Sequence, residues 1–297
     1  MRWRNHRRHW RHAPHYRWSW QGQPLAVAYE TLGQGEPLLL PAFSTVASRG
    51  ELRGLAQRLA AGFGVVALDW PGLGDSDRPP LAYTPELYRQ FLQDFGREVL
   101  AAPVPVVAPG QAAGYAIALA ERQPPLASQL VLVAPTWQGP LVAMSGQRRR
   151  WHALVRRLVR APGIGSALYG LNTLPAFLRA MYAGHVYCDH QQLTPAFIRA
   201  KQQIARQPGA RFAPAAFVTG ALDPVAECSA ALARLQPPPL PTLVLVAEDA
   251  LRQSRANMEA LAALPEVQSA RIPGALGAHE EFPEATFEAM RGFLPLA

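Results

Sequence analysis

Pro103-Val-Pro-Val-Val-Ala-Pro-Gly-Gln-Ala-Ala-Gly-Tyr-Ala-Ile-Ala-Leu-Ala-Glu121 is the stretch that decides the fold. Val104 to Ala108 is a short apolar run, Pro109-Gly110 interrupts it, and the residues from Ala112 onward are mostly helix formers. This order predicts a buried strand, a sharp turn and a helix. A strand that enters a helix in this way is typical of a parallel sheet.

Further apolar runs alternate with helix-forming segments on both sides of this stretch. Leu25–Tyr29 leads through Gly33 and Gly35 into Leu38–Leu40, which is a hairpin signal. The alternation predicts an α/β fold, with a mostly parallel central sheet and helices on both of its faces. The other expected strands are 65–68, 129–134, 243–246 and 270–272, and the expected helices are 53–61, one opening at Thr84, 254–264 and 284–293.

Two motifs carry a resemblance to a known family. Asp69-Trp-Pro-Gly-Leu-Gly-Asp-Ser76 looks very like the D-x-P-G-x-G-x-S turn of many α/β-hydrolases, and Gly110-Gln-Ala-Ala-Gly114 resembles their G-x-S-x-G nucleophile elbow. The resemblance covers Gln21 to the C-terminus and implies an α/β-hydrolase fold with a helical cap. The chain also resembles an uncharacterised subgroup from photosynthetic bacteria whose elbow carries alanine.

The three positions of a Ser-Asp-His triad hold residues without the required chemistry. Such a triad needs a nucleophile, a histidine base and a carboxylate that orients the histidine. By the resemblance, the nucleophile position is Ala112, the acid position is Ala250 and the histidine position is Leu276. An alanine methyl group cannot attack a carbonyl, so the pattern predicts a pseudoenzyme.

Displaced groups leave a catalytic alternative open. His279 lies one turn after the expected histidine, and Asp249 or Glu248 could serve as its acid. We expect the elbow's surroundings to form a pocket for an apolar small molecule; its lining would be Ala42, Phe43, Ser44, Gln111, Ala112, Ala113 and Leu276. Ser44 is more typical of a turn former than of a nucleophile.

The expected domains are an arm, a core and a cap. Residues 1–20 are an Arg/Trp/His arm that we expect to be disordered, 21–135 and 239–297 form the hydrolase core, and 136–238 form a helical cap. In the cap, Arg148–Arg160 predicts a basic amphipathic helix, which would either lie on an anionic membrane or close over an apolar pocket.

Charge and cysteine content limit the remaining functional classes. Six arginines precede Glu30, the first acidic residue, and account for most of the +8 net charge of the 297-residue chain. The arm could therefore contact an anionic membrane or an acidic protein, whereas nucleic acid is not expected. Cys188 and Cys228 have no metal-type spacing, and the residues from His185 to His190 fit no recognised metal site. No cofactor is expected, and the protein is expected in the cytoplasm or peripherally on a membrane.

Three functions follow from the sequence. The first is a non-catalytic hydrolase-fold protein that binds an apolar small molecule or a protein partner. The second is a hydrolase or lyase that acts on an ester, an amide or a lipid-like substrate through displaced residues. The third is a peripheral membrane or assembly factor. The fold alone does not choose among them, because it hosts many chemistries.

Overall fold

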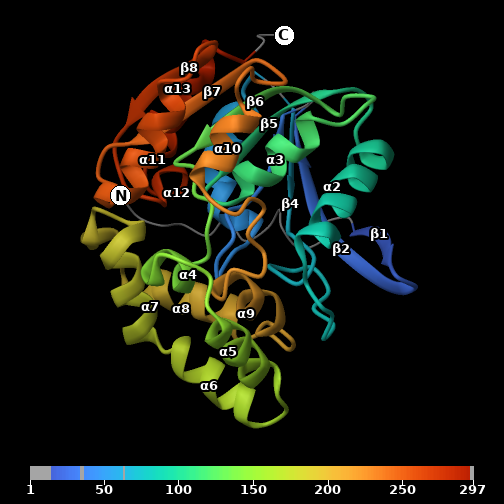
Figure 1. Cartoon of the computed structure of the whole chain (residues 1–297), viewed down its shortest axis with the longest axis vertical. Coiled ribbons are helices and arrows are strands. Elements are labelled where there is room, and N and C mark those ends of the chain that lie inside the picture. Colours follow the sequence, from blue (N-terminus) through green and yellow to red (C-terminus); the bar gives the residue numbers. More distant parts are fainter. Residues whose placement is uncertain (1–14, 34–36, 63, 295–297) are drawn as a thin grey trace.

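A central eight-stranded sheet organises the chain (Figure 1). The structure is a computed structural model, and it describes residues 15–33, 37–62 and 64–294. The strands lie in the order β1-β2-β4-β3-β5-β6-β7-β8, of which β3 to β8 run parallel and β1 and β2 antiparallel. This confirms the predicted fold class. The strands are β1 His15–Trp20, β2 Gln23–Leu32, β3 Leu38–Leu39, β4 Val65–Leu68, β5 Val104–Pro109, β6 Ala127–Val133, β7 Thr242–Ala247 and β8 Val267–Ile272.

Helices cover both faces of the sheet because alternate strand residues point to opposite sides. Leu39, Val107 and Val131 belong to a core beneath α1 (Arg53–Leu59) and α13 (Pro283–Arg291). The neighbouring strand residues belong to the larger core on the other face. That face is covered by α2 (Pro85–Val99), α3 (Ala112–Ala120), α10 (Cys228–Arg234) and α11 (Arg252–Ala262).

The start of α2 shows why the sequence folds as expected there. Thr84 is the N-cap, and its side-chain hydroxyl accepts a hydrogen bond from Leu87 N at 3.3 Å. Pro85 occupies the first turn, where its missing N–H costs nothing. The predicted opening of this helix at Thr84 is therefore confirmed.

The D-x-P-G-x-G-x-S turn after β4 is a rigid structural element. The fully buried Asp69 carboxylate forms an ion pair with Arg49 and accepts hydrogen bonds from the backbone N–H groups of Arg49 and Asp75. Ser76 Oγ donates to Asp69 O and accepts from Ala28 N. A Cβ atom at Gly74 would collide with the Asp69 carboxylate, so only glycine fits there. The motif thus shapes the edge of the sheet.

Two predictions about the N-terminal region are wrong. Residues 15–20, expected within a disordered arm, form the edge strand β1, and residues 1–14 of that arm lie outside the described residues. Tyr16 and Trp18 are buried against α2, and Trp18 Nε1 donates to Asp94 at 2.9 Å. The expected hairpin from 25–29 to 38–40 is absent, since β2 pairs with β1 and β4 instead.

The segment between β6 and β7 contains only helices in the described residues. They form a layer at one end of the molecule, away from the sheet (Figure 1). However, α10 packs against α11, so the chain returns to the core before the predicted boundary at 238. The layer comprises α4 Pro140–Ser145, α5 Arg150–Arg160, α6 Ile164–Asn172, α7 Pro175–Met181, a π-helical turn Tyr182–Val186, a 3-10 turn His190–Gln192, α8 Pro195–Ala205 and α9 Phe212–Val218.

The cap is tied to the loop after β8 and to the short helix that follows it, α12 (Ala278–Glu281). Lys201 Nζ lies 2.7 Å from Glu280 Oε1, and Glu281 accepts hydrogen bonds from the backbone of Cys188 and Asp189. Gly277 N donates to Val186 O at 2.8 Å. None of the helices among the described residues is long and apolar enough to cross a membrane.

Candidate functional site

The turn between β5 and α3 has its left-handed residue at Gly110, whose φ is +56°. Gly110 N donates to Val133 O and Gly110 O accepts from Thr136 N, which fixes the turn against the end of β6. A Cβ atom added to Gly110 would lie 3.5 Å from Ala42 Cβ and 3.7 Å from Thr136 Oγ1, with no third contact within 4 Å. A side chain here would therefore project between the ends of β3, β5 and β6.

This geometry moves the elbow position two residues back from the predicted Ala112. Ala112 is the first residue of α3, has no exposed surface and belongs to the large core. Gln111, before it, has an ordinary right-handed helical backbone. The residue that the turn projects is thus Gly110, which has no side chain at all. The physical reason is that the strained turn needs positive φ, which glycine adopts without steric cost.

The loop after β3 directs its largest side chain into the protein. Phe43 stacks on Trp70 with ring centroids 4.7 Å apart, inside an aromatic cluster that also includes Tyr88 and Tyr115. Trp70 Nε1 donates to Pro41 O at 2.7 Å. Of the expected pocket lining, Phe43, Gln111, Ala112 and Ala113 are therefore buried in packed structure, whereas Ala42, Ser44 and Leu276 keep some exposure.

Ser44 acts as a turn former. Its Oγ accepts a hydrogen bond from Val46 N at 3.1 Å, two residues later in the same loop. Among the described residues, no histidine contacts this hydroxyl. The expectation that Ser44 stabilises a turn is confirmed by this bond.

His279 is paired with a carboxylate that the sequence did not indicate. Its Nε2 lies 3.3 Å from Glu51 Oε1, and both side chains are almost completely buried. The same Glu51 oxygen accepts a hydrogen bond from Ala42 N at 2.6 Å, in the loop beside the elbow. His279 Nδ1 is buried and has no hydrogen-bond partner among the described residues. Ala42 links the pair to the elbow, because its Cβ lies 3.5 Å from the Cβ that a side chain at Gly110 would have. In the described part of the chain, no hydroxyl or thiol is bonded to the imidazole.

The two carboxylates proposed as partners of His279 are engaged elsewhere or exposed. Asp249 Oδ2 accepts a hydrogen bond from Gly274 N at 2.9 Å, which ties the loop after β7 to the loop after β8. Glu248 is exposed on the same loop. The predicted pairing of His279 with Asp249 or Glu248 is therefore wrong. The predicted acid position, Ala250, is buried, and the predicted histidine position, Leu276, packs against the large core.

A buried carboxylate lies on the cap side of the elbow. Asp223 Oδ1 accepts hydrogen bonds from Gln111 Nε2 at 2.9 Å and from Gly139 N at 2.8 Å. Burial raises the pKa of Asp223 to about 6, and these bonds together with nearby Arg148 oppose the rise. The network joins the start of α3 to the start of the cap. The network satisfies Gln111 Nε2, whereas Gln111 Oε1 is buried without a hydrogen-bond partner among the described residues.

Neither cysteine is positioned as a nucleophile. Burial and the neighbouring Glu281 raise the pKa of the Cys188 thiol to about 11, which leaves little thiolate at neutral pH. Burial also raises the pKa of Cys228. Both cysteines are free thiols, and no group of three or more His, Cys, Asp and Glu side chains in the described part of the chain is arranged to hold a metal ion.

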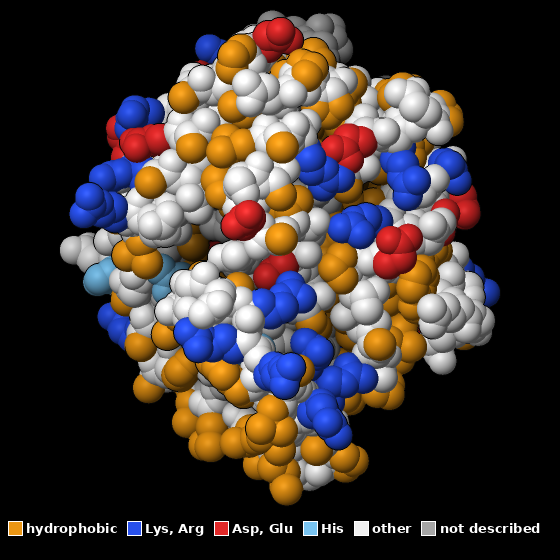
Figure 2. All heavy atoms as spheres, in the orientation of Figure 1, with side chains coloured by type: hydrophobic (Ala, Val, Ile, Leu, Met, Phe, Trp, Pro, Cys, Tyr) orange, Lys and Arg blue, Asp and Glu red, His pale blue; other side chains and the backbone are white. Residues whose placement is uncertain are grey.

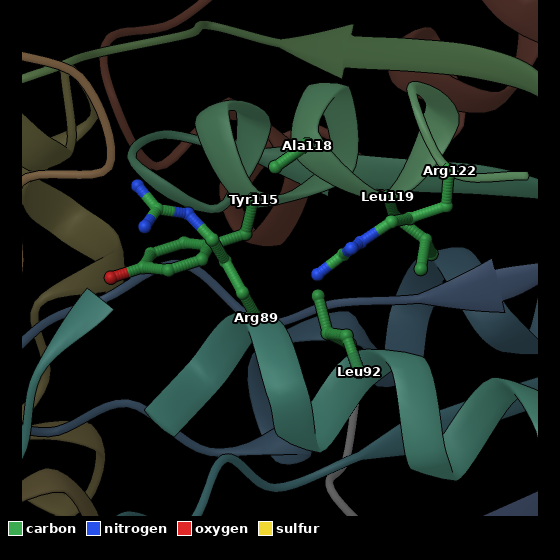
Figure 3. Close-up of a pocket in the computed structure, with 6 residues that line it drawn as sticks. All are labelled: Arg89, Leu92, Tyr115, Ala118, Leu119 and Arg122. Atoms are coloured by element: carbon green, nitrogen blue, oxygen red, sulfur yellow. The ribbon is translucent and has the colours of Figure 1, made fainter. Parts of the chain in front are cut away.

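A small cavity lies between α2 and α3, away from the elbow turn (Figure 3). Its volume is about 10 Å³, which is room for roughly one water molecule. Figure 3 shows the Tyr115 ring beside the Arg89 side chain at this cavity. Tyr115 OH donates to Leu222 O at 2.7 Å, so this tyrosine belongs to the packed core. The other lining residues are Leu92, Ala118, Leu119 and Arg122.

The roles of Gly110, Glu51 and Asp223 at this site were not predicted from the sequence. The position of Gly110 could have been predicted, because glycine is the residue of this turn that adopts a positive φ with least strain. The role of Glu51 could not be predicted, since it lies 228 positions before His279. Asp223 likewise bonds to Gln111, which lies 112 positions earlier in the chain, and no local sequence pattern predicts such a contact.

The chain resembles known proteins over nearly its whole length. A family model described as "Alpha/beta hydrolase family" matches residues 5–289. Similar solved structures include a thermophilic esterase from Thermogutta terrifontis, with 23% identity, a TM-score of 0.70 and coverage of 95% of this chain and 98% of that chain. A probable hydrolytic enzyme from Pseudomonas aeruginosa has 21% identity and a TM-score of 0.70, with 95% and 93% covered. An enol-lactonase from Burkholderia xenovorans has 16% identity and a TM-score of 0.69, with 91% and 96% covered. No curated protein sequence matches the chain.

Proposed function

The chain belongs to the alpha/beta hydrolase family, and from that premise we propose that it is a non-catalytic member which binds an apolar small molecule or a protein partner. The observation that carries the proposal is Gly110 at the left-handed position of the elbow. Acyl transfer in this fold begins with attack by a side chain at that position, and glycine has none.

The surroundings of the elbow support binding rather than turnover. Ala42, Ser44, Thr136 and Leu276 are partly exposed near the ends of the strands, whereas the imidazole of His279 is engaged with Glu51. A surface of small apolar and hydroxyl-bearing side chains suits a compact apolar ligand with one polar group. Such a ligand would meet no activated nucleophile.

A displaced hydrolase is the second candidate, and the His279–Glu51 pair is the observation that favours it. A histidine held by a buried carboxylate is the arrangement that a general base needs. The base would still require a hydroxyl or an activated water in reach. Thr136 is the nearest hydroxyl to the Gly110 position, and Ser44 lies in the adjoining loop.

One set of measurements separates the two. We expect the purified protein to show no turnover of acyl esters from short to long chains, and no mass increase after treatment with a fluorophosphonate. Ester turnover that disappears in His279→Ala, with the fold retained by circular dichroism, would contradict the binding proposal and establish the displaced centre. Independently of turnover, native mass spectrometry of the untreated protein would show whether a small molecule co-purifies, as the binding proposal expects.

The proposal keeps the expected cytoplasmic location. Both cysteines are free thiols, as a reducing compartment would leave them. Contact with a membrane surface is a separate matter and concerns the cap.

A further inference from the structure

Large exposed hydrophobic side chains are concentrated on the cap. Of the ten such residues in the described part of the chain, nine lie between Met144 and Phe177, and Leu251 is the tenth. Ile164 is 65% exposed and Leu171 is 62% exposed. Figure 2 shows the hydrophobic colour gathered at the end of the molecule where Figure 1 places α6. We define the cap face by Leu154 and Leu158 of α5, Ile164, Leu168 and Leu171 of α6, and Phe177 of α7.

The packing of α6 fixes the outward direction of this face. Gly165 and Tyr169 are the buried residues of α6, and Tyr169 OH donates to Thr45 O at 3.4 Å. Ile164, Leu168 and Leu171 follow a spacing of four and three residues, which places them on one stripe of the helix. This helix contains no charged residue. Its solvent side is thus apolar where an ordinary surface helix is polar.

The cap is also strongly basic. The helical layer from α4 to α9, residues 140–218, contains eleven arginines and lysines and a single acidic residue, Asp189. Arg150 and Arg157 lie seven residues apart on α5, next to its exposed leucines, and neither forms an ion pair with a described residue. Figure 2 shows arginine and lysine side chains gathered directly beside the hydrophobic end of the molecule.

From this combination we propose that the cap face docks peripherally on an anionic lipid bilayer. Apolar side chains would enter the interface while arginines contact phosphate groups, which they bind in a bidentate manner. A second copy of the chain is the poorer occupant, because two basic caps would face each other with the same charge. Without such a partner, this apolar patch would be exposed to water, which is unfavourable. The inference does not rest on the function proposed for the elbow.

The test uses flotation of the full-length protein with vesicles. We expect the protein to float with phosphatidylcholine vesicles that contain phosphatidylglycerol, and to float far less with phosphatidylcholine alone. The double variant Leu168→Gln/Leu171→Gln should lower the partition coefficient by about tenfold, because two leucine side chains no longer insert into the apolar part of the interface. Arg150→Gln with Arg157→Gln should remove much of the preference for anionic vesicles, and added salt should do the same.

Leu251→Gln is the matched control, because Leu251 is 57% exposed but lies outside the cap face. It should leave the partition coefficient unchanged. Equal flotation on neutral and anionic vesicles would overturn the proposal, as would unchanged flotation of the double leucine variant, which would place the contact elsewhere. A dimer in sedimentation that depends on Leu168 and Leu171, without vesicle binding, would identify a second copy as the occupant and overturn it too.

Discussion

Gly110 decides what the turn after β5 can do. Glycine adopts its φ of +56° without steric strain, whereas the same backbone conformation destabilises a residue with a Cβ atom by about 1 kcal/mol or more. The contacts a Cβ atom would make, at 3.5 Å and 3.7 Å, are ordinary, so strain and not collision sets the cost. We expect Gly110→Ala to lower the free energy of unfolding by about 1 kcal/mol in urea denaturation.

Gly170→Ala is the matched control. Gly170 lies inside α6 with nothing within 4 Å of an added Cβ atom, and its φ is not positive. Replacing glycine by alanine within a helix stabilises by up to about 1 kcal/mol. The two variants should therefore shift stability in opposite directions. A stabilised Gly110→Ala would show that the turn does not require the left-handed backbone.

Edge strand β1 is the element that differs most from the sequence-based prediction. His15-Tyr-Arg-Trp-Ser-Trp20 alternates between inward and outward residues, but the arginines and histidines before it suggested a solvated arm. The inward pair, Tyr16 and Trp18, packs on Phe91 and Phe95 of α2, more than 70 positions away. The alternation was visible locally, whereas the surface that receives it was not.

Trp18→Ala tests this element. Its side chain is 6% exposed, contacts Phe91 at 5.3 Å between ring centroids and donates to Asp94. Removing it should cost about 3 kcal/mol of unfolding free energy, as for other buried aromatic residues. Arg17→Ala, on the exposed side of the same strand, should change stability by less than about 0.5 kcal/mol. Equal effects of the two variants in urea denaturation would mean that β1 does not pack as described.

Asp223 makes the junction between α3 and the cap sensitive to pH. Its pKa is raised from 3.8 to about 6 by burial, so the folded protein holds this proton more tightly than the unfolded chain. Stability should therefore fall as the pH rises from about 4 to about 6, by up to about 3 kcal/mol from this group, and the loss should be complete above that range.

The measurement compares wild type with Asp223→Asn, whose amide oxygen can still accept the bond from Gly139. Other titrating groups affect both proteins, so the difference between their unfolding free energies isolates Asp223. The unfolding free energy of wild type minus that of the variant should be larger near pH 4 than near pH 7. A difference that is constant with pH would show that Asp223 titrates alike in the folded and unfolded states.

Across the whole molecule, the sequence predicted the order of strands and helices better than the contacts between them. The sheet, the helical cap and the turn from Asp69 to Ser76 follow from short apolar runs, glycines and caps, each readable within a few residues. The elbow was placed two residues late, since Gly110 and Gly114 both fit a small-residue pattern. The His279–Glu51 pair could not be predicted, because no local pattern joins positions 228 residues apart.

Another long-range contact, between Lys201 and Glu280, connects the cap to the core. Lys201 of α8 is almost fully buried, with Nζ 2.7 Å from Glu280 Oε1 and within 6 Å of the ring centroids of Tyr182 and Phe197. Lys201→Met keeps most of the side-chain volume but leaves the Glu280 carboxylate without its cation. Breaking a largely buried pair from one side costs about 3 kcal/mol.

We therefore expect Lys201→Met to lower the unfolding free energy by that amount and to speed hydrogen exchange in α7 and α8, which pack against each other. Adding Glu280→Gln should recover much of the loss, because a neutral amide costs less to bury than an unpaired carboxylate. Arg291→Met removes an exposed ion pair with Glu288 and should cost less than about 0.5 kcal/mol. Unchanged exchange in the cap of Lys201→Met would contradict this expectation. It would mean that other bonds hold the cap on the core without the ion pair, such as Gly277 N to Val186 O and the Glu281 carboxylate to Cys188 N and Asp189 N.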